Sequence, residues 1–87
     1  MYVITVYDIN EKRVNKVLKI CRKYLIWIQN SVLEGEITKA KYEKLKMEIS
    51  DVIDPEEDSV VFYILRNTKY SAREILGQEK GERGNII

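Results

Sequence analysis

Few side chains in this chain of 87 residues could carry out acid–base or metal chemistry. There is no histidine, which excludes histidine–metal sites, histidine general bases and the Ser–His and Cys–His nucleophile pairs. The single cysteine, Cys21, excludes an intrachain disulfide and a cysteine-rich zinc site, and its apolar helical neighbours predict a buried small hydrophobe. The main remaining candidate is Asp8, which ends the apolar run from Tyr2 to Tyr7.

Asp8 has two interpretations. It is either a turn or capping residue, as aspartate commonly is after a strand, or a carboxylate held at the end of a rigid element to bind a cation. In a homodimer whose two-fold axis passes near this strand end, two copies of Asp8 would meet and would need a cation between them. Magnesium suits such a site, because it takes one or two carboxylates and fills its shell with water and phosphate oxygens. It would polarise a phosphodiester and lower the pKa of a bound water.

A predicted helix over residues 11–25 supplies the second candidate, a basic face. Only Glu11 on this face is acidic, and the acids that balance its charge are far along the chain, in residues 51–58 and the tail. The face is either an ordinary solvated surface or a stripe that neutralises phosphates without reading bases. Its basic residues are Lys12, Arg13, Lys16, Lys19, Arg22 and Lys23. Ser31, at a break between two apolar runs, is either a turn residue or a hydroxyl near a metal or phosphate.

Hydrophobic periodicity predicts the elements that must position these side chains. The order is strand, helix, strand or strand pair, helix and strand, with a short strand or two after, and the polar break at residues 29–31 favours the pair. It favours an α+β ferredoxin-like sandwich, with both helices on one face of an antiparallel sheet. The expected ranges are strand 2–9, helix 11–25, two strands within 25–37, helix 38–53, strand 60–65 and a short strand 73–76.

Two helices can cover only one face of such a sheet, and this predicts the oligomeric state. The other face would expose apolar residues of both central strands, a patch that monomers avoid. We therefore expect a homodimer that packs sheet against sheet. The ferredoxin-like domain is expected to span residues 1–77, and residues 78–87 to form a linker and a tail whose final isoleucine pair docks on another surface.

The overall charge and hydropathy do not favour any particular class of binding partner. Fifteen Lys and Arg nearly cancel fourteen Asp and Glu. No apolar run approaches the roughly 20 residues of a membrane span, and the N-terminus lacks the features of a signal peptide. A soluble cytoplasmic protein without membrane contact is expected.

Several segments, in order along nearly the whole chain, resemble the small CRISPR-associated endoribonuclease family, the small partners of the CRISPR spacer integrase. They are the strand ending YDI at Asp8, the basic helix beginning KR, the stretches WIQNSVLEGEI and DPEEDSVVFYIL, and EILG before the isoleucine tail. The most specific is QNSVLEG after the YDI strand. The chain reads Tyr24-Leu25 where the family often has Tyr-Gly, which affects only the local turn.

The resemblance implies a ferredoxin-like homodimer that binds nucleic acid, either duplex DNA or single-stranded RNA, together with the integrase. It implies Mg²⁺ or another divalent cation on Asp8 as the metal-binding catalytic residue, and a C-terminal strand around Asn85–Ile87 that crosses to the other protomer. Lys12, Arg13, Lys16 and Ser31 are the residues expected to contact nucleic acid. The alternatives are a non-enzymatic scaffold that bridges duplex DNA between integrase subunits, and a toxin-like ribonuclease of the same fold.

Overall fold

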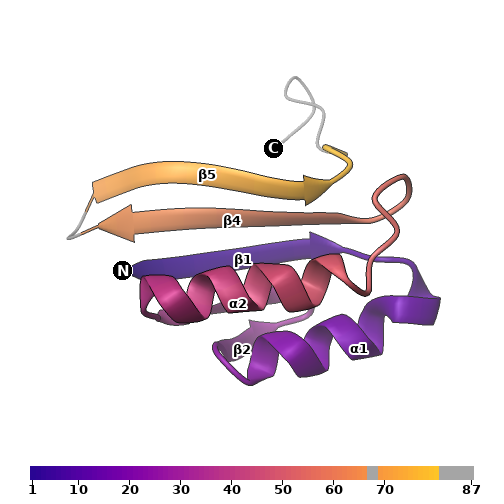
Figure 1. Cartoon of the computed structure of the whole chain (residues 1–87), viewed down its shortest axis with the longest axis horizontal. Coiled ribbons are helices and arrows are strands. Elements are labelled where there is room, and N and C mark those ends of the chain that lie inside the picture. Colours follow the sequence, from indigo (N-terminus) through magenta and orange to yellow (C-terminus); the bar gives the residue numbers. More distant parts are fainter. Residues whose placement is uncertain (67–68, 81–87) are drawn as a thin grey trace.

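The computed structural model describes residues 1–66 and 69–80, with the backbone alone at 69–71. Two helices and five strands follow one another along the chain (Figure 1). They are β1 (Tyr2–Asp8), α1 (Glu11–Arg22), β2 (Ile26–Gln29), β3 (Val32–Glu36), α2 (Lys39–Ser50), β4 (Ser59–Arg66) and β5 (Lys69–Gly77).

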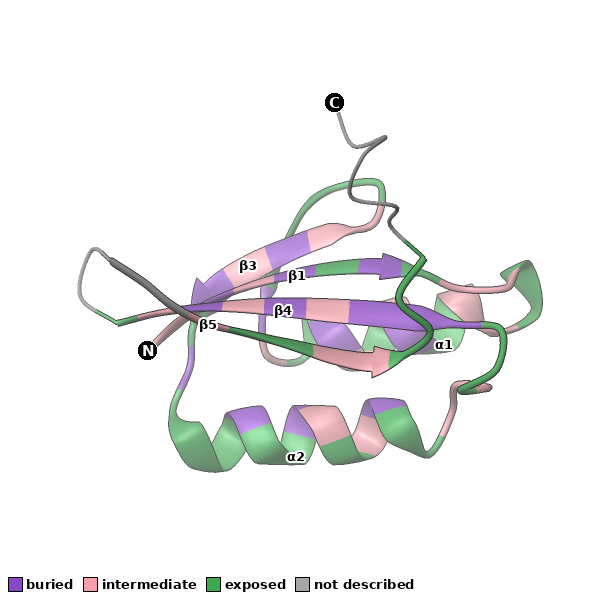
Figure 2. Ribbon diagram, turned by 90° about the horizontal axis from the view of Figure 1, so that it is seen from above, coloured by how far each residue is buried: buried purple, intermediate pink, exposed green. Residues whose placement is uncertain are grey.

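The strands form one antiparallel sheet in the order β2-β3-β1-β4-β5. Both helices lie on the same side of it (Figure 2). The predicted ferredoxin-like sandwich is therefore confirmed. The predicted break within residues 25–37 is also confirmed, because Asn30 has a positive φ of 35° in the turn between β2 and β3.

Alternation along the central strands builds the core. Val3 and Tyr7 of β1 and Phe62 of β4 point toward the helices and are buried, whereas their neighbours in sequence are less so, as the banding along β4 shows in Figure 2. The helices contribute Val17, Cys21, Tyr42, Leu45 and Ile49, all buried. Cys21 is thus the predicted small core residue, and its burial raises the pKa of the thiol to about 12.

Each helix begins at a capping residue and ends earlier than predicted. The side chains of Asn10 and Thr38 accept hydrogen bonds from the backbone N–H groups of Lys12 and Lys41. α1 ends at Arg22 rather than residue 25, and α2 at Ser50 rather than residue 53. The apolar residues beyond each end still pack on the core, but from turns, so hydrophobic periodicity alone overestimated the helix lengths.

Strand β5 is longer than the predicted strand 73–76. It spans Lys69–Gly77 because it pairs with the whole of β4, from Ser59 opposite Gly77 to Arg66 opposite Lys69. Its polar residues obscured the strand pattern. Of the predicted linker and tail, residues 78–87, the last seven lie outside the described residues, including the isoleucine pair that was expected to dock.

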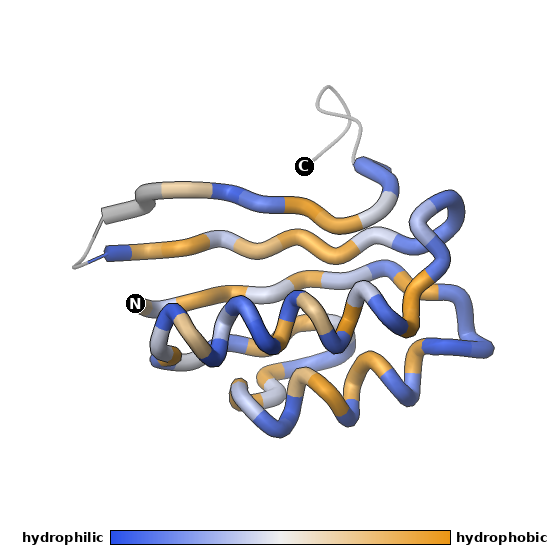
Figure 3. The backbone as a smooth tube through the Cα atoms, in the orientation of Figure 1, coloured by the Kyte–Doolittle hydropathy of each residue, from blue (hydrophilic) through white to orange (hydrophobic). Residues whose placement is uncertain are grey.

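The sheet face opposite the helices is apolar, and no described element covers it. We call it the open face, and define it by the apolar residues that alternate outward: Tyr2, Ile4, Val6, Val61, Tyr63, Leu65 and Ile75. Hydrophobic residues accordingly run along most of β1 and β4, whereas the turns that follow β1 and precede β4 are largely hydrophilic (Figure 3). Neither described helix is long and apolar enough to cross a bilayer.

Candidate metal and nucleic-acid site

Asp8 is the last residue of β1, and its side chain is 72% exposed. It lies opposite Ser59 in the final residue pair between β1 and β4. Alternation along β1 places it on the same side of the sheet as Val6, at one end of the open face. The carboxylate is therefore accessible to a ligand while its backbone belongs to a central strand.

A hollow of about 320 Å³ lies beside Asp8 on the open face. Its lining combines apolar side chains of β1, β4 and β5 with the charged residues Arg73, Glu79 and Lys80. The Lys80 Nζ is 3.5 Å from the Asp8 Oδ2 and 3.4 Å from the Asp8 carbonyl oxygen. A lysine ammonium thus lies where a cation would neutralise this carboxylate.

The donor set fits a magnesium ion only in part. An exposed carboxylate is a ligand that Mg²⁺ takes readily, but Asp8 supplies just one. Among residues 1–66 and 69–80, no three acidic or cysteine side chains converge on a point that could hold a metal. The other carboxylate that lines the hollow, Glu79, pairs with Arg73 at 3.0 Å. A second ligand for such an ion would therefore come from Glu79 after it leaves Arg73, from another copy of the chain, or from phosphate and water oxygens.

Ser31 lies near the Asp8 end of the sheet. Its carbonyl oxygen accepts a hydrogen bond from the N–H of Tyr7, the residue before Asp8, at 3.1 Å. The backbone that places Ser31 is therefore bonded to the strand that carries Asp8. A contact between its hydroxyl and nucleic acid stays a prediction.

Arg13 does not lie on a free basic stripe. Its guanidinium binds the Asp58 carboxylate with two nitrogens, Nε to Oδ2 at 2.6 Å and Nη2 to Oδ1 at 3.2 Å. Nη2 also lies 3.3 Å from the Glu57 Oε1. Asp58 is fully buried, and its bond to Arg13 helps to hold the pKa of its carboxyl at about 2. Arg13 therefore links α1 to the turn before β4.

This pairing corrects the predicted charge distribution. The acidic segment 51–58 is far from α1 in sequence but folds back onto its first turn. At the other end of the helix Lys23 pairs with Glu48. Lys12 and Lys16 remain as exposed basic residues near the Asp8 end of α1. The predicted basic stripe on α1 therefore has fewer unpaired basic residues than the sequence suggested, because Arg13 and Lys23 are paired with acidic residues.

Sequence reasoning did not single out Asp58, Ser59 or Lys80, although all three lie around Asp8. Asp58 was expected in the acidic turn 51–58, and Ser59 fell between that turn and the predicted strand 60–65. A signal was available, since an antiparallel partner for the end of β1 must begin near residue 59. The approach of Lys80 had no such signal, because it depends on how the chain leaves β5.

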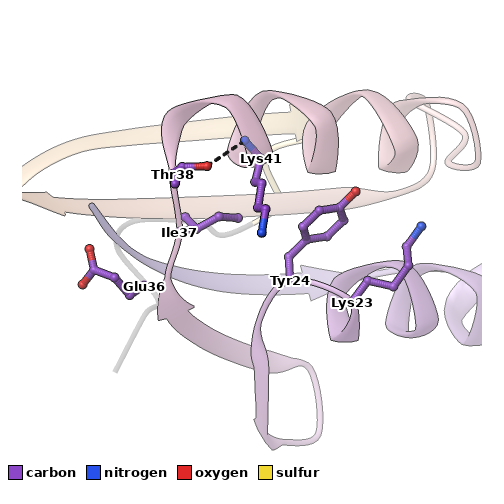
Figure 4. Close-up of a pocket in the computed structure, with 6 residues that line it drawn as sticks. All are labelled: Lys23, Tyr24, Glu36, Ile37, Thr38 and Lys41. Carbon is purple, nitrogen blue, oxygen red and sulfur yellow. Dashed lines mark hydrogen bonds between the residues drawn. The ribbon is translucent and has the colours of Figure 1, made fainter.

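A second hollow, of about 260 Å³, lies between the end of α1, the end of β3 and the first turn of α2 (Figure 4). The ring of Tyr24 points into the space between these elements, and Thr38 caps α2 through the N–H of Lys41 (Figure 4). None of the predicted site residues lines it.

Comparison with known proteins gives one consistent result. Residues 1–73 match the family model described as CRISPR associated protein Cas2. The chain is 67% identical over 87 residues to the CRISPR-associated endoribonuclease Cas2 of Dictyoglomus turgidum and 64% identical to that of Thermotoga maritima, with full coverage of all chains.

Solved structures agree with these sequence matches. A crystal structure of Cas2 that is 42% identical superimposes with a TM-score of 0.75, covering 100% of this chain and 98% of the other. The structure of Streptococcus pyogenes Cas2 at pH 6.5, 36% identical, has a TM-score of 0.70 and covers 76% and 87% of the two chains. The chain therefore belongs to the CRISPR-associated Cas2 family.

Proposed function

We propose that this protein is a magnesium-dependent endonuclease of CRISPR spacer acquisition, acting on single-stranded RNA or duplex DNA as a homodimer in which each protomer contributes one Asp8. The integrase subunit is its expected partner in the cell. Family membership and the names of its relatives support the reaction class. The observation that carries the proposal is the exposed Asp8 carboxylate at the end of a central strand, beside an apolar face that a second copy would cover.

The chain's own residues would divide the work as follows. Asp8 would hold the ion and so fix the position of the scissile phosphate, and the sheet would keep this carboxylate in one place. When bound, Mg²⁺ supplies Lewis-acid chemistry to phosphodiester hydrolysis. Lys80, which also lines the hollow, would have to yield the Asp8 oxygens to the ion, because the two cations compete for the same carboxylate.

The test compares wild type with Asp8→Asn on labelled single-stranded RNA and duplex DNA, with Mg²⁺ and with a chelator. We expect wild-type cleavage only with Mg²⁺, and for Asp8→Asn no more than the no-protein background, with unchanged circular dichroism. Asp51→Asn is the matched control, an exposed carboxylate at the end of α2 that should cleave like wild type. Equal cleavage by wild type and Asp8→Asn would identify a contaminating nuclease and refute the proposal.

A non-enzymatic scaffold that binds duplex DNA is the second candidate, and the exposed Lys12 and Lys16 favour it. Replacing both by alanine is expected to weaken duplex binding and to lower the slope of log affinity against log salt by about one for each phosphate that is no longer neutralised. Fluorescence anisotropy at several salt concentrations measures this. Lys41→Ala with Lys44→Ala removes equal charge from α2, and an equal loss in that control would mean that only net charge matters.

A further inference from the structure

Asp58 joins the chain segments that surround Asp8. Its Oδ1 accepts a hydrogen bond from the N–H of Asn10 at 2.9 Å, and its Oδ2 accepts one from the N–H of Asp54 at 2.8 Å. The same carboxylate binds the Arg13 guanidinium. Asn10 is two residues after Asp8 and caps α1 through Lys12. The chain leaving Asp8 is therefore fixed to a fully buried anion.

The main chain of Asp58 fixes the segment after β5, which leads to Lys80. The Asp58 carbonyl oxygen accepts a hydrogen bond from the N–H of Gln78 at 2.8 Å. This approach requires glycine at position 77, which has φ of +82° and where an added Cβ would lie 2.0 Å from that oxygen. Gln78 is two residues before Lys80, which pairs with Asp8. Ser59, which follows Asp58 in the chain, is the strand partner of Asp8.

We propose that Asp58 is the positioning residue of the Asp8 site. It fixes the backbone after Asp8 through Asn10 and Arg13, and it fixes the segment that carries the competing Lys80 through Gln78. Asp58 is buried and is not among the residues that line the hollow, so its contribution is geometric. Groups that orient a metal ligand commonly matter for affinity almost as much as the ligand. This inference rests on the proposed function, because it assigns a partner to the same carboxylate.

The experiment measures Mn²⁺ binding by electron paramagnetic resonance in folded wild type, Asp8→Asn, Asp58→Asn and Glu48→Gln. Asp58→Asn keeps the shape of the side chain but removes the charge. We expect it to bind Mn²⁺ about tenfold more weakly than wild type. Glu48→Gln is the matched control, because Glu48 also accepts from a cation, Lys23, and from another donor, Tyr24, but contacts nothing near Asp8.

A second readout needs no metal. Backbone ¹⁵N order parameters at residues 8–10 are expected to fall in Asp58→Asn and to stay at the wild-type value in Glu48→Gln. A decrease in global stability alone would not produce this local difference in a folded protein. If Asp58→Asn does not fold, Arg13→Lys replaces it, since lysine keeps the charge but lacks the paired donors. That variant should show the same changes to a smaller degree.

The outcomes separate the two proposals. If Asp8→Asn binds Mn²⁺ as tightly as wild type, the proposed metal site is overturned. The order parameters alone then test whether Asp58 positions the backbone at residues 8–10. Mn²⁺ affinity and order parameters that are both unchanged in the Asp58 or Arg13 variant overturn the positioning role. The positioning role is also overturned if wild type binds Mn²⁺ through Asp8 but the Asp58 or Arg13 variant lowers the order parameters without lowering Mn²⁺ affinity.

Discussion

Replacing Asp58 by alanine is expected to destabilise the folded protein by about 3–5 kcal/mol. The change leaves the Arg13 guanidinium, 22% exposed, without its main partner and removes the acceptor for the N–H groups of Asn10 and Asp54. Domains have total stabilities of about 5–15 kcal/mol, so much of the population could unfold at the lower end of that range. Urea denaturation at several protein concentrations measures the destabilisation and separates it from any change in association.

Glu57→Ala provides the control for this prediction. Glu57 also contacts Arg13, at 3.3 Å, but its side chain is 54% exposed. An ion pair in water contributes at most about 1 kcal/mol, so the variant should remain close to wild type. Similar destabilisation by Asp58→Ala and Glu57→Ala would mean that burial of the Asp58 pair does not determine its contribution.

Low pH is expected to decrease the free energy of unfolding by protonating the Asp58 carboxylate. Arg13 and the backbone donors lower the pKa of Asp58 to about 2 in the folded state, against about 3.9 in an unfolded chain. A lowered folded-state pKa stabilises the protein above the unfolded value, and this stabilisation is lost as pH falls from about 4 to 2. The difference of almost two pKa units corresponds to about 2–3 kcal/mol.

Urea midpoints between pH 5 and pH 2 test this dependence. The pKa values of Glu48 and Glu74 are also lowered, by hydrogen bonds to Lys23 and Tyr24 and to Tyr42 and Lys46, so wild type loses stability from several groups together. Asp58→Asn should show a flatter decline than wild type below pH 4. Parallel declines in the two proteins would exclude Asp58 as a source of acid sensitivity.

The fold was predictable because its determinants are local. Strands β1 and β4 are runs of β-branched and aromatic residues, and the caps Asn10 and Thr38 precede regular apolar stripes. The predicted position of Asp8 at a strand end followed from the same local pattern. Helix ends and the length of β5 were less accurate, because turn residues can pack on the core and polar residues can pair in a sheet when a partner strand is present.

The surroundings of Asp8 were not predictable in the same way. Arg13 and Asp58 are 45 residues apart, and no spacing rule connects them. Their contact exists only after β4 pairs with β1, which brings the acidic turn to the start of α1. The sequence contained both charges but not their proximity, so a structural ion pair looked like part of a nucleic-acid surface.

Replacing Val61 by glutamate is expected to convert the proposed dimer into a folded monomer. Val61 lies on the open face of β4, opposite Val6 of β1 and Ile75 of β5. In a monomer the new carboxylate would face water. In a two-fold dimer that buries this face, each subunit would bring one unpaired charge into an apolar interface, so the penalty is counted twice. We expect the dissociation constant to rise about 1000-fold or more, since about 1.4 kcal/mol corresponds to tenfold.

Sedimentation velocity over a range of concentrations measures the change. Met47→Glu is the control, because it also exchanges an apolar side chain for glutamate, but at a position on α2 that is 65% exposed. It should stay dimeric. A wild type that sediments as a monomer at all concentrations, or a dimer that survives Val61→Glu, would show that the open face is not the interface.

The same variant tests whether the site needs two subunits. Val61 also lines the hollow beside Asp8, so Val61→Glu changes that lining, but it removes neither Asp8 nor the hydrogen bonds of Asp58. A site complete within one chain is therefore expected to keep cleaving in the monomer. One carboxylate holds a magnesium ion weakly, and within residues 1–66 and 69–80 no cluster of three acidic or cysteine side chains surrounds it, while the nearby Glu79 pairs with Arg73. We therefore expect cleavage to disappear together with the dimer and to persist in Met47→Glu. Full activity in a Val61→Glu monomer would instead place the complete catalytic centre on a single protomer.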